Sequence, residues 1–235
     1  MITEKILNYF QNVEKKREWS NNVFRASSSG KCARALAYQR LEYEAEPLSA
    51  RARMVFRMGD LVEQDMVNAC EAVECLTDMQ KEANFILPNG QEVTGHIDGI
   101  TEFNGEKIVV DFKSISMFGF MRAEKGELDY SYKCQATCYM KALDLKKFLF
   151  LFYNKNTSHV TEILYQWDEK ILNEVVDRFT RVGQATKENL PNKDYGPNAK
   201  GDLPYQCSYC AYANVCQTDY ELIFEKGKPK LRRRK

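Results

Sequence analysis

Hydrophobic residues recur every three or four positions in five stretches of the chain, a spacing typical of amphipathic helices. The first stretch is marked by Ile6, Leu7, Phe10 and Val13. Turn-forming and polar residues separate the stretches from one another. Five helices are predicted. They cover residues 3–18, a segment that begins at Cys32 and is broken at residues 44–47, a segment that begins at about residue 50, residues 132–142 and residues 168–189.

Five further segments have the composition of β-strands. Residues 147–153 are almost all apolar, as in a buried strand, and residues 160–167 alternate as a partner strand would. Residues 116–131 predict a long loop or a short helix. The remaining strands are predicted at residues 81–87, 92–103 and 106–115. This order predicts an α/β fold of the α+β type, with a mixed sheet flanked by helices.

The stretch from Gly95 to Lys113 contains the strongest local signal in the chain. Asn104 and Gly105 separate two β-type runs, a pattern that favours a two-residue type I′ hairpin turn. If residue 103 pairs with residue 106, the register places Asp98 directly opposite Asp111, with Cβ atoms roughly 4.5–5.5 Å apart. Lys113 follows on the same face because strand side chains alternate.

Two carboxylates facing each other across a sheet repel, so the pair predicts chemistry rather than stability. A divalent cation held between Asp98 and Asp111 would remove the repulsion, and Lys113 beside it could polarise water or a phosphate oxygen. In the alternative interpretation a β-bulge shifts the register and the two carboxylates separate into solvent. The same register puts His96 opposite Lys113, where it could reach a phosphate or be an ordinary neighbour.

Composition places few further limits on the chain. Its 235 residues, 44% of them hydrophobic, suffice for one domain with a substantial core, or for a core with a small appended module. The net charge of +1 hides an asymmetry, because the tail 226–235 holds seven of the 34 basic residues and no acid. We therefore expect one acidic domain over 1–225 and a separate basic tail, which either solubilises the protein or binds phosphate.

The sequence also predicts a cellular location. No apolar run approaches the length of a membrane span, and the N-terminus lacks the apolar core of a signal peptide. We expect a soluble cytoplasmic protein (in the host cell, if the chain is viral) with no membrane partner.

The eight cysteines indicate metal or redox chemistry, because an intracellular protein of this size is not a disulfide scaffold. Cys207, Cys210 and Cys216 form a compact C-x2-C-x5-C group that needs a fourth ligand. Cys32, at a loop–helix junction, is the best candidate, since a thiolate is stabilised there. Four thiolates suit zinc or an iron–sulfur cluster. The absence of two C-x2-C pairs favours a [4Fe–4S] cluster, with zinc and no metal as the alternatives. The other candidates for the fourth ligand are Cys70, Cys75, Cys134 and Cys138.

The order of these motifs resembles the RecB-like branch of the PD-(D/E)XK nucleases. The similarity is greatest to the CRISPR-associated RecB-type exonucleases with an iron–sulfur cluster and to the nuclease domain of AddB. It runs from about Ser27 to Cys216, and the joint order of motifs carries it rather than any one of them. The motifs are Cys32, Glu63, Gly95-x2-Asp98, Asp111-x-Lys113, Gln135-x3-Tyr139 and Cys207/Cys210/Cys216.

The resemblance implies a role for each motif residue. Asp98, Asp111 and the backbone carbonyl of Phe112 would bind Mg²⁺ or Mn²⁺, and Glu63 would join them at a position where the iron–sulfur relatives usually carry His. Lys113 would position or help deprotonate the attacking water, and the helix carrying Gln135 and Tyr139 would line the site and contact DNA. The set Cys32, Cys207, Cys210 and Cys216 would hold a structural [4Fe–4S] cluster that staples the N- and C-terminal segments of a restriction-endonuclease-like domain.

The resemblance also implies an activity. We expect a metal-dependent DNA exonuclease that prefers single strands or DNA ends and serves recombination, repair or CRISPR-adaptation-like processing, alone or with a partner protein from such a pathway. The alternatives are a non-catalytic nucleic-acid-binding scaffold subunit of the same fold, and a flap or duplex endonuclease.

Overall fold

A computed structural model describes residues 1–13, 23–225 and 228–234. The chain divides into two compact units, which are described here one at a time. The first comprises Met1–Gly30 and Ala50–Asp177, and the second comprises Lys31–Ser49 and Arg178–Lys235.

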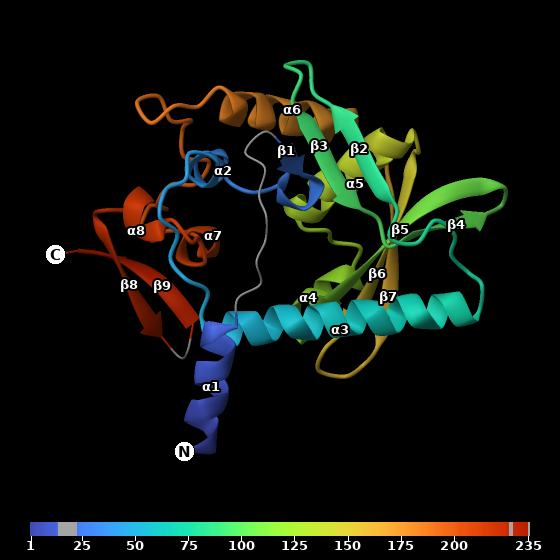
Figure 1. The fold of residues 1–235 in the computed structure, drawn as a ribbon, viewed down its shortest axis with the longest axis horizontal. Helices are drawn as coiled ribbons and strands as arrows, with labels where there is room; N and C mark the ends of the chain where they lie inside the picture. Colours follow the sequence, from blue (N-terminus) through green and yellow to red (C-terminus); the bar gives the residue numbers. More distant parts are fainter. Residues whose placement is uncertain (14–22, 226–227, 235) are drawn as a thin grey trace. The chain divides into compact units, whose positions relative to one another are not determined.

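The first unit contains two mixed β-sheets (Figure 1). The smaller sheet has the order β1-β3-β2, in which β3 is parallel to β1 and antiparallel to β2. The larger sheet has the order β4-β5-β6-β7, and only its central pair, β5 and β6, is parallel. The strands are β1 (Val23–Arg25), β2 (Glu82–Ile86), β3 (Glu92–His96), β4 (Gly99–Phe103), β5 (Glu106–Ile115), β6 (Lys147–Asn154) and β7 (Val160–Gln166).

Strand β6 supplies much of the core of this unit. Its buried and half-buried residues alternate along its whole length, so that Phe148, Phe150 and Phe152 all point to one face and are fully buried. Their rings follow one another at centroid distances of 4.6 and 5.7 Å. Strand β6 pairs in parallel with β5, the strand that carries Asp111 and Lys113.

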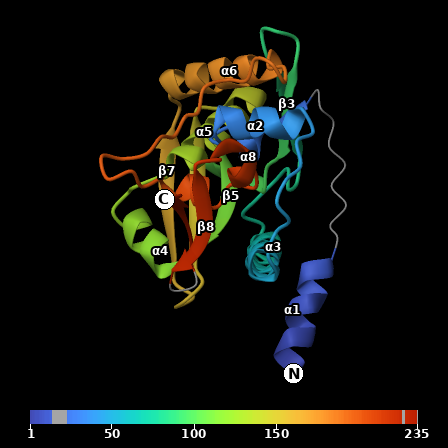
Figure 2. The same cartoon turned by 90° about the vertical axis from the view of Figure 1, so that its left-hand side faces the viewer.

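Helices pack against the sheets of the first unit (Figures 1 and 2). Helix α3 lies against β5, and α5 lies against β2, β6 and the short helix η1. Seven consecutive residues of α5, 134–140, are buried, which makes it the innermost helix. The helices are α1 (Ile2–Asn12), η1 (Ala26–Ser28), α3 (Ala50–Ala72), α4 (Met117–Ala123) and α5 (Tyr130–Leu143).

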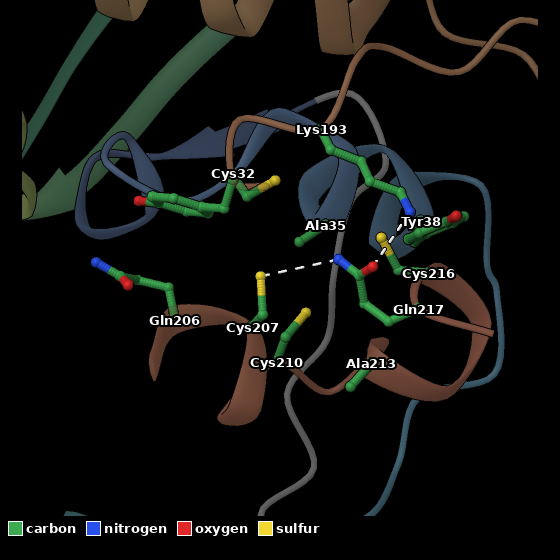
Figure 3. A pocket seen from close by; sticks show the side chains of 11 residues that line it. Cys32, Ala35, Tyr38, Lys193, Gln206, Cys207, Cys210, Ala213, Cys216 and Gln217 are labelled. Atoms are coloured by element: carbon green, nitrogen blue, oxygen red, sulfur yellow. Dashed lines mark hydrogen bonds between the residues drawn. The ribbon is translucent and has the colours of Figure 1, made fainter. Parts of the chain in front are cut away.

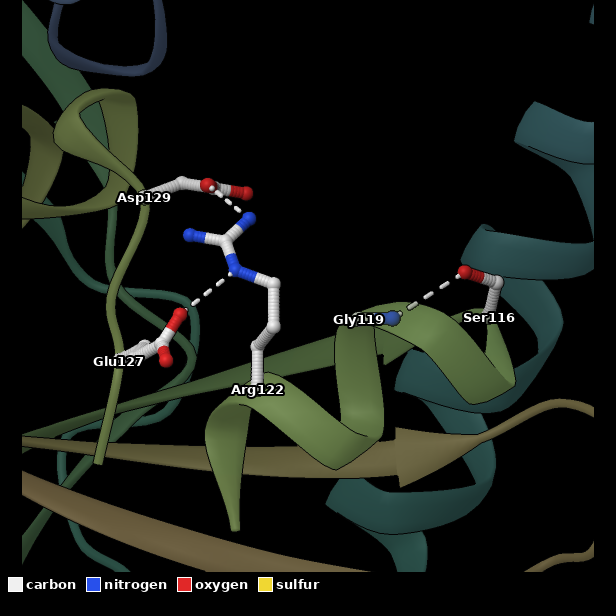
Figure 4. Close-up of polar contacts among 5 residues, drawn as sticks. All are labelled: Ser116, Gly119, Arg122, Glu127 and Asp129. Atoms are coloured by element: carbon white, nitrogen blue, oxygen red, sulfur yellow. Dashed lines mark hydrogen bonds and ion pairs between the residues drawn. The ribbon is translucent and has the colours of Figure 1, made fainter. Parts of the chain in front are cut away.

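Local hydrogen bonds fix both ends of α4, which follows β5 directly (Figure 4). The hydroxyl of Ser116, the N-cap, accepts from the backbone N–H of Gly119 at 3.4 Å. Near the other end, the Arg122 guanidinium donates to Glu127 and to Asp129, each at 2.9 Å. These bonds hold the chain that leads from β5 to α5.

The second unit is smaller. It contains α2 (Ala33–Arg40), α7 (Tyr205–Ser208), α8 (Ala213–Cys216) and the antiparallel hairpin of β8 (Tyr220–Glu225) and β9 (Lys228–Arg233). Its core includes Leu203, Ala213 and Leu231, which are buried together. Helix α6 (Glu169–Gly183) crosses the boundary between the two units.

The mixed sheets flanked by helices confirm the predicted fold class, and each predicted strand and helix has a counterpart. The bounds of several helices differ from the prediction, most clearly those of α6 and of the N-terminal helix. Helix α6 ends at Gly183 rather than at residue 189. The N-terminal helix ends at Asn12, and the predicted continuation over residues 14–18 lies outside the described residues.

The prediction of one continuous strand over residues 92–103 was wrong. The segment forms β3 in the smaller sheet and β4 in the larger one. The chain changes partners at Ile97 and Asp98, because the Ile97 N–H donates to the Lys81 carbonyl and the Asp98 carboxylate accepts from the Phe112 N–H. The Asp98 side chain thus replaces the next rung of the β4–β5 ladder.

Three strands were not predicted. Strand β1 has only three residues, too few for a periodicity. Strands β8 and β9 pair Glu221 and Glu225 with residues of the basic tail, so residues 228–233 of that tail are a strand. None of the helices within the described ranges is long and apolar enough to cross a membrane.

Candidate active site

Asp98 and Asp111 lie at the junction of the two sheets of the first unit. Asp98 stands between β3 and β4, and Asp111 lies in the middle of β5. Both side chains are buried, with 6% and 3% of the residue surface exposed. Charged residues are seldom buried this far without a partner or an ion.

The predicted hairpin brings the two carboxylates together. Phe103 pairs with Glu106 and the register runs unshifted to Gly99 and Val110, so the predicted register is confirmed over the whole of β4. Asn104 and Gly105 both have positive φ, 53° and 77°, as a type I′ turn requires. The backbone ladder stops one pair short of Asp98 and Asp111. Beyond it, the side chain of Asp98 rather than its backbone accepts a hydrogen bond from β5.

The Asp98 carboxylate is held by β5. Its Oδ2 accepts from the backbone N–H of Phe112 at 2.6 Å. Burial, followed by the negative charge of Asp111, raises the pKa of Asp98 to about 8, although the Phe112 hydrogen bond acts in the opposite direction. The pair therefore favours a bound proton or a bound cation at neutral pH.

Lys113 neutralises part of this charge. Its ammonium forms an ion pair with Asp111 Oδ2. Burial lowers the pKa of Lys113, but the charges of Asp111 and Asp98 outweigh it, so the net pKa lies above its ordinary value. Lys113 is therefore charged, and one cation faces two carboxylates.

Helix α5 contributes two side chains from the other side of the site. Gln135 Nε2 donates to Asp111 Oδ1 at 3.3 Å and fixes that carboxylate. Tyr139 interacts with Gln135, and burial, followed by the nearby carboxylate of Asp111, raises the Tyr139 pKa to about 12. Its phenol is thus a hydrogen-bond donor at every physiological pH.

Gly95 makes room for Tyr139. A Cβ built at residue 95 would lie 2.7 Å from the phenol oxygen, a distance that real Cβ atoms essentially never show. Any side chain here would displace the tyrosine or β3. The Gly95-x2-Asp98 motif therefore needs a glycine at its first position for a steric reason.

Glu63 approaches from α3 and is half-buried. Burial, followed by the charge of Asp111, raises its pKa, so its carboxylate lies within electrostatic reach of Asp111. Val67, one turn further along α3, is buried against Val110 and Phe112 of β5. This packing turns the Glu63 face of the helix toward the carboxylate pair.

The donor chemistry at this site fits a hard divalent cation, because it offers carboxylate and carbonyl oxygens. Within the described ranges, however, no group of three or more His, Cys, Asp or Glu side chains is arranged to hold a metal ion. The acids are brought near one another by three different elements without forming a finished cage.

Two further side chains qualify the sequence interpretation. Tyr132 was not predicted, yet its ring centroid lies 5.8 Å from Lys113 Nζ and its phenol group contributes to the raised pKa of Lys113. Its position three residues before Gln135, on the same face of α5, was the available signal. The placement of His96 opposite Lys113 was wrong, because His96 pairs with Glu82 in the smaller sheet and is exposed.

Four cysteines line one pocket in the second unit (Figure 3). They come from the N-cap of α2, from α7, from the turn after it and from the end of α8. Burial, followed by the nearby thiols of the set, raises the pKa of Cys207 to about 11, and Gln217 Nε2 donates to its Sγ at 3.9 Å. The set is Cys32, Cys207, Cys210 and Cys216. The remaining cysteines, Cys70, Cys75, Cys134 and Cys138, belong to the first unit.

One known protein family matches most of the chain. The profile of the PD-(D/E)XK nuclease superfamily matches residues 5–217. The crystal structure of SSO0001 is similar in fold, with a TM-score of 0.63 and 16% identity over 92% of this chain and 96% of that one. No protein of curated function matches significantly.

Two solved exonucleases show a weaker likeness. The alkaline exonuclease LHK-Exo of Laribacter hongkongensis has a TM-score of 0.46 and 13% identity over 76% of this chain and 92% of its own. The phage-related exonuclease of Haemophilus somnus 129PT has a TM-score of 0.45 and 14% identity over 68% and 91%.

Proposed function

The chain belongs to the PD-(D/E)XK nuclease superfamily, and we propose that it is a Mg²⁺- or Mn²⁺-dependent deoxyribonuclease that degrades single-stranded DNA or DNA from its ends. The observation that carries the proposal is the buried pair of Asp98 and Asp111, faced by the single ammonium of Lys113. Such a pair is costly in a structural role and suited to holding a cation.

Asp98 and Asp111 would bind the cation, with the carbonyl of Phe112 and, on binding, the carboxylate of Glu63 as further ligands. When bound, the cation would generate hydroxide near neutral pH and neutralise charge on the phosphate. DNA would help to complete the site, since Mg²⁺ is commonly bound by one or two carboxylates plus substrate phosphates.

The other side chains would act on the water and the phosphate. Lys113, charged at neutral pH, would orient the attacking water and stabilise the extra charge of the transition state. Gln135 would keep Asp111 in place through its hydrogen bond. Tyr139, a permanent donor, would contact the DNA strand.

We further propose that Cys32, Cys207, Cys210 and Cys216 hold a [4Fe–4S] cluster, as in the RecB-like branch. The support is the donor set, because four thiols line one pocket, and burial, followed by the neighbouring thiols, raises the pKa of Cys207. In the described part of the chain, these four thiols are not arranged as a group that could hold a metal ion. The cluster would brace the second unit and take no part in hydrolysis. A role in recombination, repair or CRISPR-adaptation-like processing, with a partner protein from that pathway, follows from the same resemblance.

Labelled oligonucleotides test the activity. Linear and circular DNA, each single-stranded and duplex, are incubated with Mg²⁺, with Mn²⁺ and with a chelator. We expect metal-dependent loss of the linear single strand and survival of both circles. Cleavage of the duplex circle would assign a flap or duplex endonuclease instead, and no cleavage with either metal would assign a scaffold subunit.

A further inference from the structure

The C-terminal end of α3 brings two cysteines close together through backbone hydrogen bonds. The helix ends at Ala72, and Glu74 has a left-handed conformation, with φ of 54°. The Cys75 N–H donates to the Cys70 carbonyl at 3.0 Å, and the Glu74 N–H donates to the Glu71 carbonyl at 3.1 Å. These two bonds define a Schellman motif.

In a Schellman motif the side chains three positions before and two positions after the cap residue commonly touch. Here these positions are Cys70 and Cys75, so the hydrogen-bonding pattern of the helix end holds two thiols together.

The two thiols differ in their surroundings. Cys75 is exposed, whereas Cys70 is half-buried and packs against Val67, Leu76 and Phe112. The half-buried Cys70 is therefore less accessible to a small reagent than the exposed Cys75. An exposed thiol that reacts first and a sheltered one that reacts second form the usual arrangement for closing a disulfide.

We propose that Cys70 and Cys75 are a modification site for low-molecular-weight disulfides, such as oxidised glutathione, which convert the pair to an intramolecular disulfide. The Cys75 thiolate attacks one sulfur of the small disulfide and releases one thiolate. The Cys70 thiolate then attacks the Cys75 sulfur of the mixed disulfide and releases the second. The two protein thiols lose two electrons and two protons, and the small disulfide gains them as two thiols.

The site lies on the helix that also carries Glu63. Glu63, Val67 and Cys70 are spaced by four and three residues and therefore share the face that packs toward β5. A disulfide at the end of this face would pin the last turn of α3. The site is independent of the proposed nuclease activity, and its test does not use DNA.

Tryptic peptides separate this pair from every other cysteine. Residues 58–81 form one peptide whose only cysteines are Cys70 and Cys75, and residues 134–141 form another with only Cys134 and Cys138. The second pair is a matched control, because it is buried within α5 and an oxidant cannot reach it. The folded protein is treated with oxidised glutathione, denatured, alkylated without reduction, digested and weighed by mass spectrometry.

We expect peptide 58–81 to lack both thiol hydrogens and to escape alkylation, while peptide 134–141 is alkylated at both cysteines. Dithiothreitol should restore alkylation of both residues in 58–81. In the Cys70→Ser variant, glutathione should stay attached to Cys75, since nothing resolves the mixed disulfide. Peptide 58–81 alkylated at both positions, or carrying glutathione in the wild type, would overturn the proposal.

Discussion

Gly95 and Tyr139 lie so close that a Cβ at residue 95 would come within 2.7 Å of the phenol oxygen. The two residues come from different elements, β3 and α5, and their contact sets the distance between the smaller sheet and the innermost helix of the first unit. The geometry of the candidate active site therefore depends on residue 95 being a glycine, which has no side chain.

Gly95→Ala should impair cleavage by displacing Tyr139. A displacement of this kind costs up to about 10²-fold in rate, and the overpacking costs about 1–3 kcal/mol of stability. Gly196→Ala is the matched control, because a Cβ there meets nothing within 4 Å. Cleavage rates and unfolding free energies of both variants check the prediction. Equal rates for Gly95→Ala and the wild type would show that the contact is not needed.

The raised pKa of Asp98 predicts how stability depends on pH. Between the ordinary value of 3.8 and about 8, the folded protein holds a proton that the unfolded chain has released. The contribution of Asp98 to stability is therefore complete below pH 3.8 and is lost as pH rises to about 8, by at most about 1.4 kcal/mol per pH unit.

The Asp98→Asn variant should show a flatter dependence than the wild type in metal-free unfolding experiments over this range. Mg²⁺ added at the alkaline end should raise the unfolding temperature of the wild type and have little effect on the variant. Parallel curves for the two proteins would mean that Asp98 ionises as it would in water.

Glu63→Gln should raise the concentration of Mg²⁺ needed for half-maximal cleavage, by about 10-fold or more, because a neutral amide is a weaker ligand for a hard cation. Asp65→Asn is the control on the same helix, since Asp65 is exposed and, two residues from Glu63, lies on another face of the helix. Metal titrations of both variants measure the effect. If both respond alike, Glu63 is an ordinary helix residue.

The cluster proposal predicts colour. Anaerobically purified protein should be brown, with broad visible absorption, and Cys210→Ser should bleach it because one of four thiolates is lost. Cys75→Ser, which changes a cysteine of the first unit, should leave the colour unchanged. A colourless wild type with stoichiometric zinc would assign a zinc site instead.

The parts of the fold that sequence predicts well are those set by neighbouring residues. Asn104 and Gly105 determine their own turn, and the register of β4 and β5 follows from it. Phe148, Phe150 and Phe152 likewise report the burial of β6 through their own alternation.

The break at Ile97 and Asp98 could not be predicted in this way. It depends on the Lys81 carbonyl, sixteen residues earlier, and on the Phe112 N–H, fourteen residues later. The hairpin rule assumed that β4 continues, whereas the carboxylate of Asp98 ends the ladder by accepting the bond of the next rung.

Two other features were hidden for related reasons. Tyr132 belongs to the site only because α5 faces Lys113, which the sequence of α5 alone does not specify. Strand β9 was hidden by its charge, because four of its six residues are basic and its pairing with β8 cannot be seen in its own sequence.

The central claim is that the buried carboxylates and Lys113 hydrolyse DNA, and one comparison tests it most directly. Cleavage of an end-labelled single strand in Mg²⁺ or Mn²⁺ is measured for the wild type, Asp111→Ala and Lys113→Ala, with circular dichroism confirming that each variant is folded. We predict metal-dependent cleavage by the wild type and a loss of about 10²-fold or more in both folded variants. Wild-type rates in either variant would contradict the account.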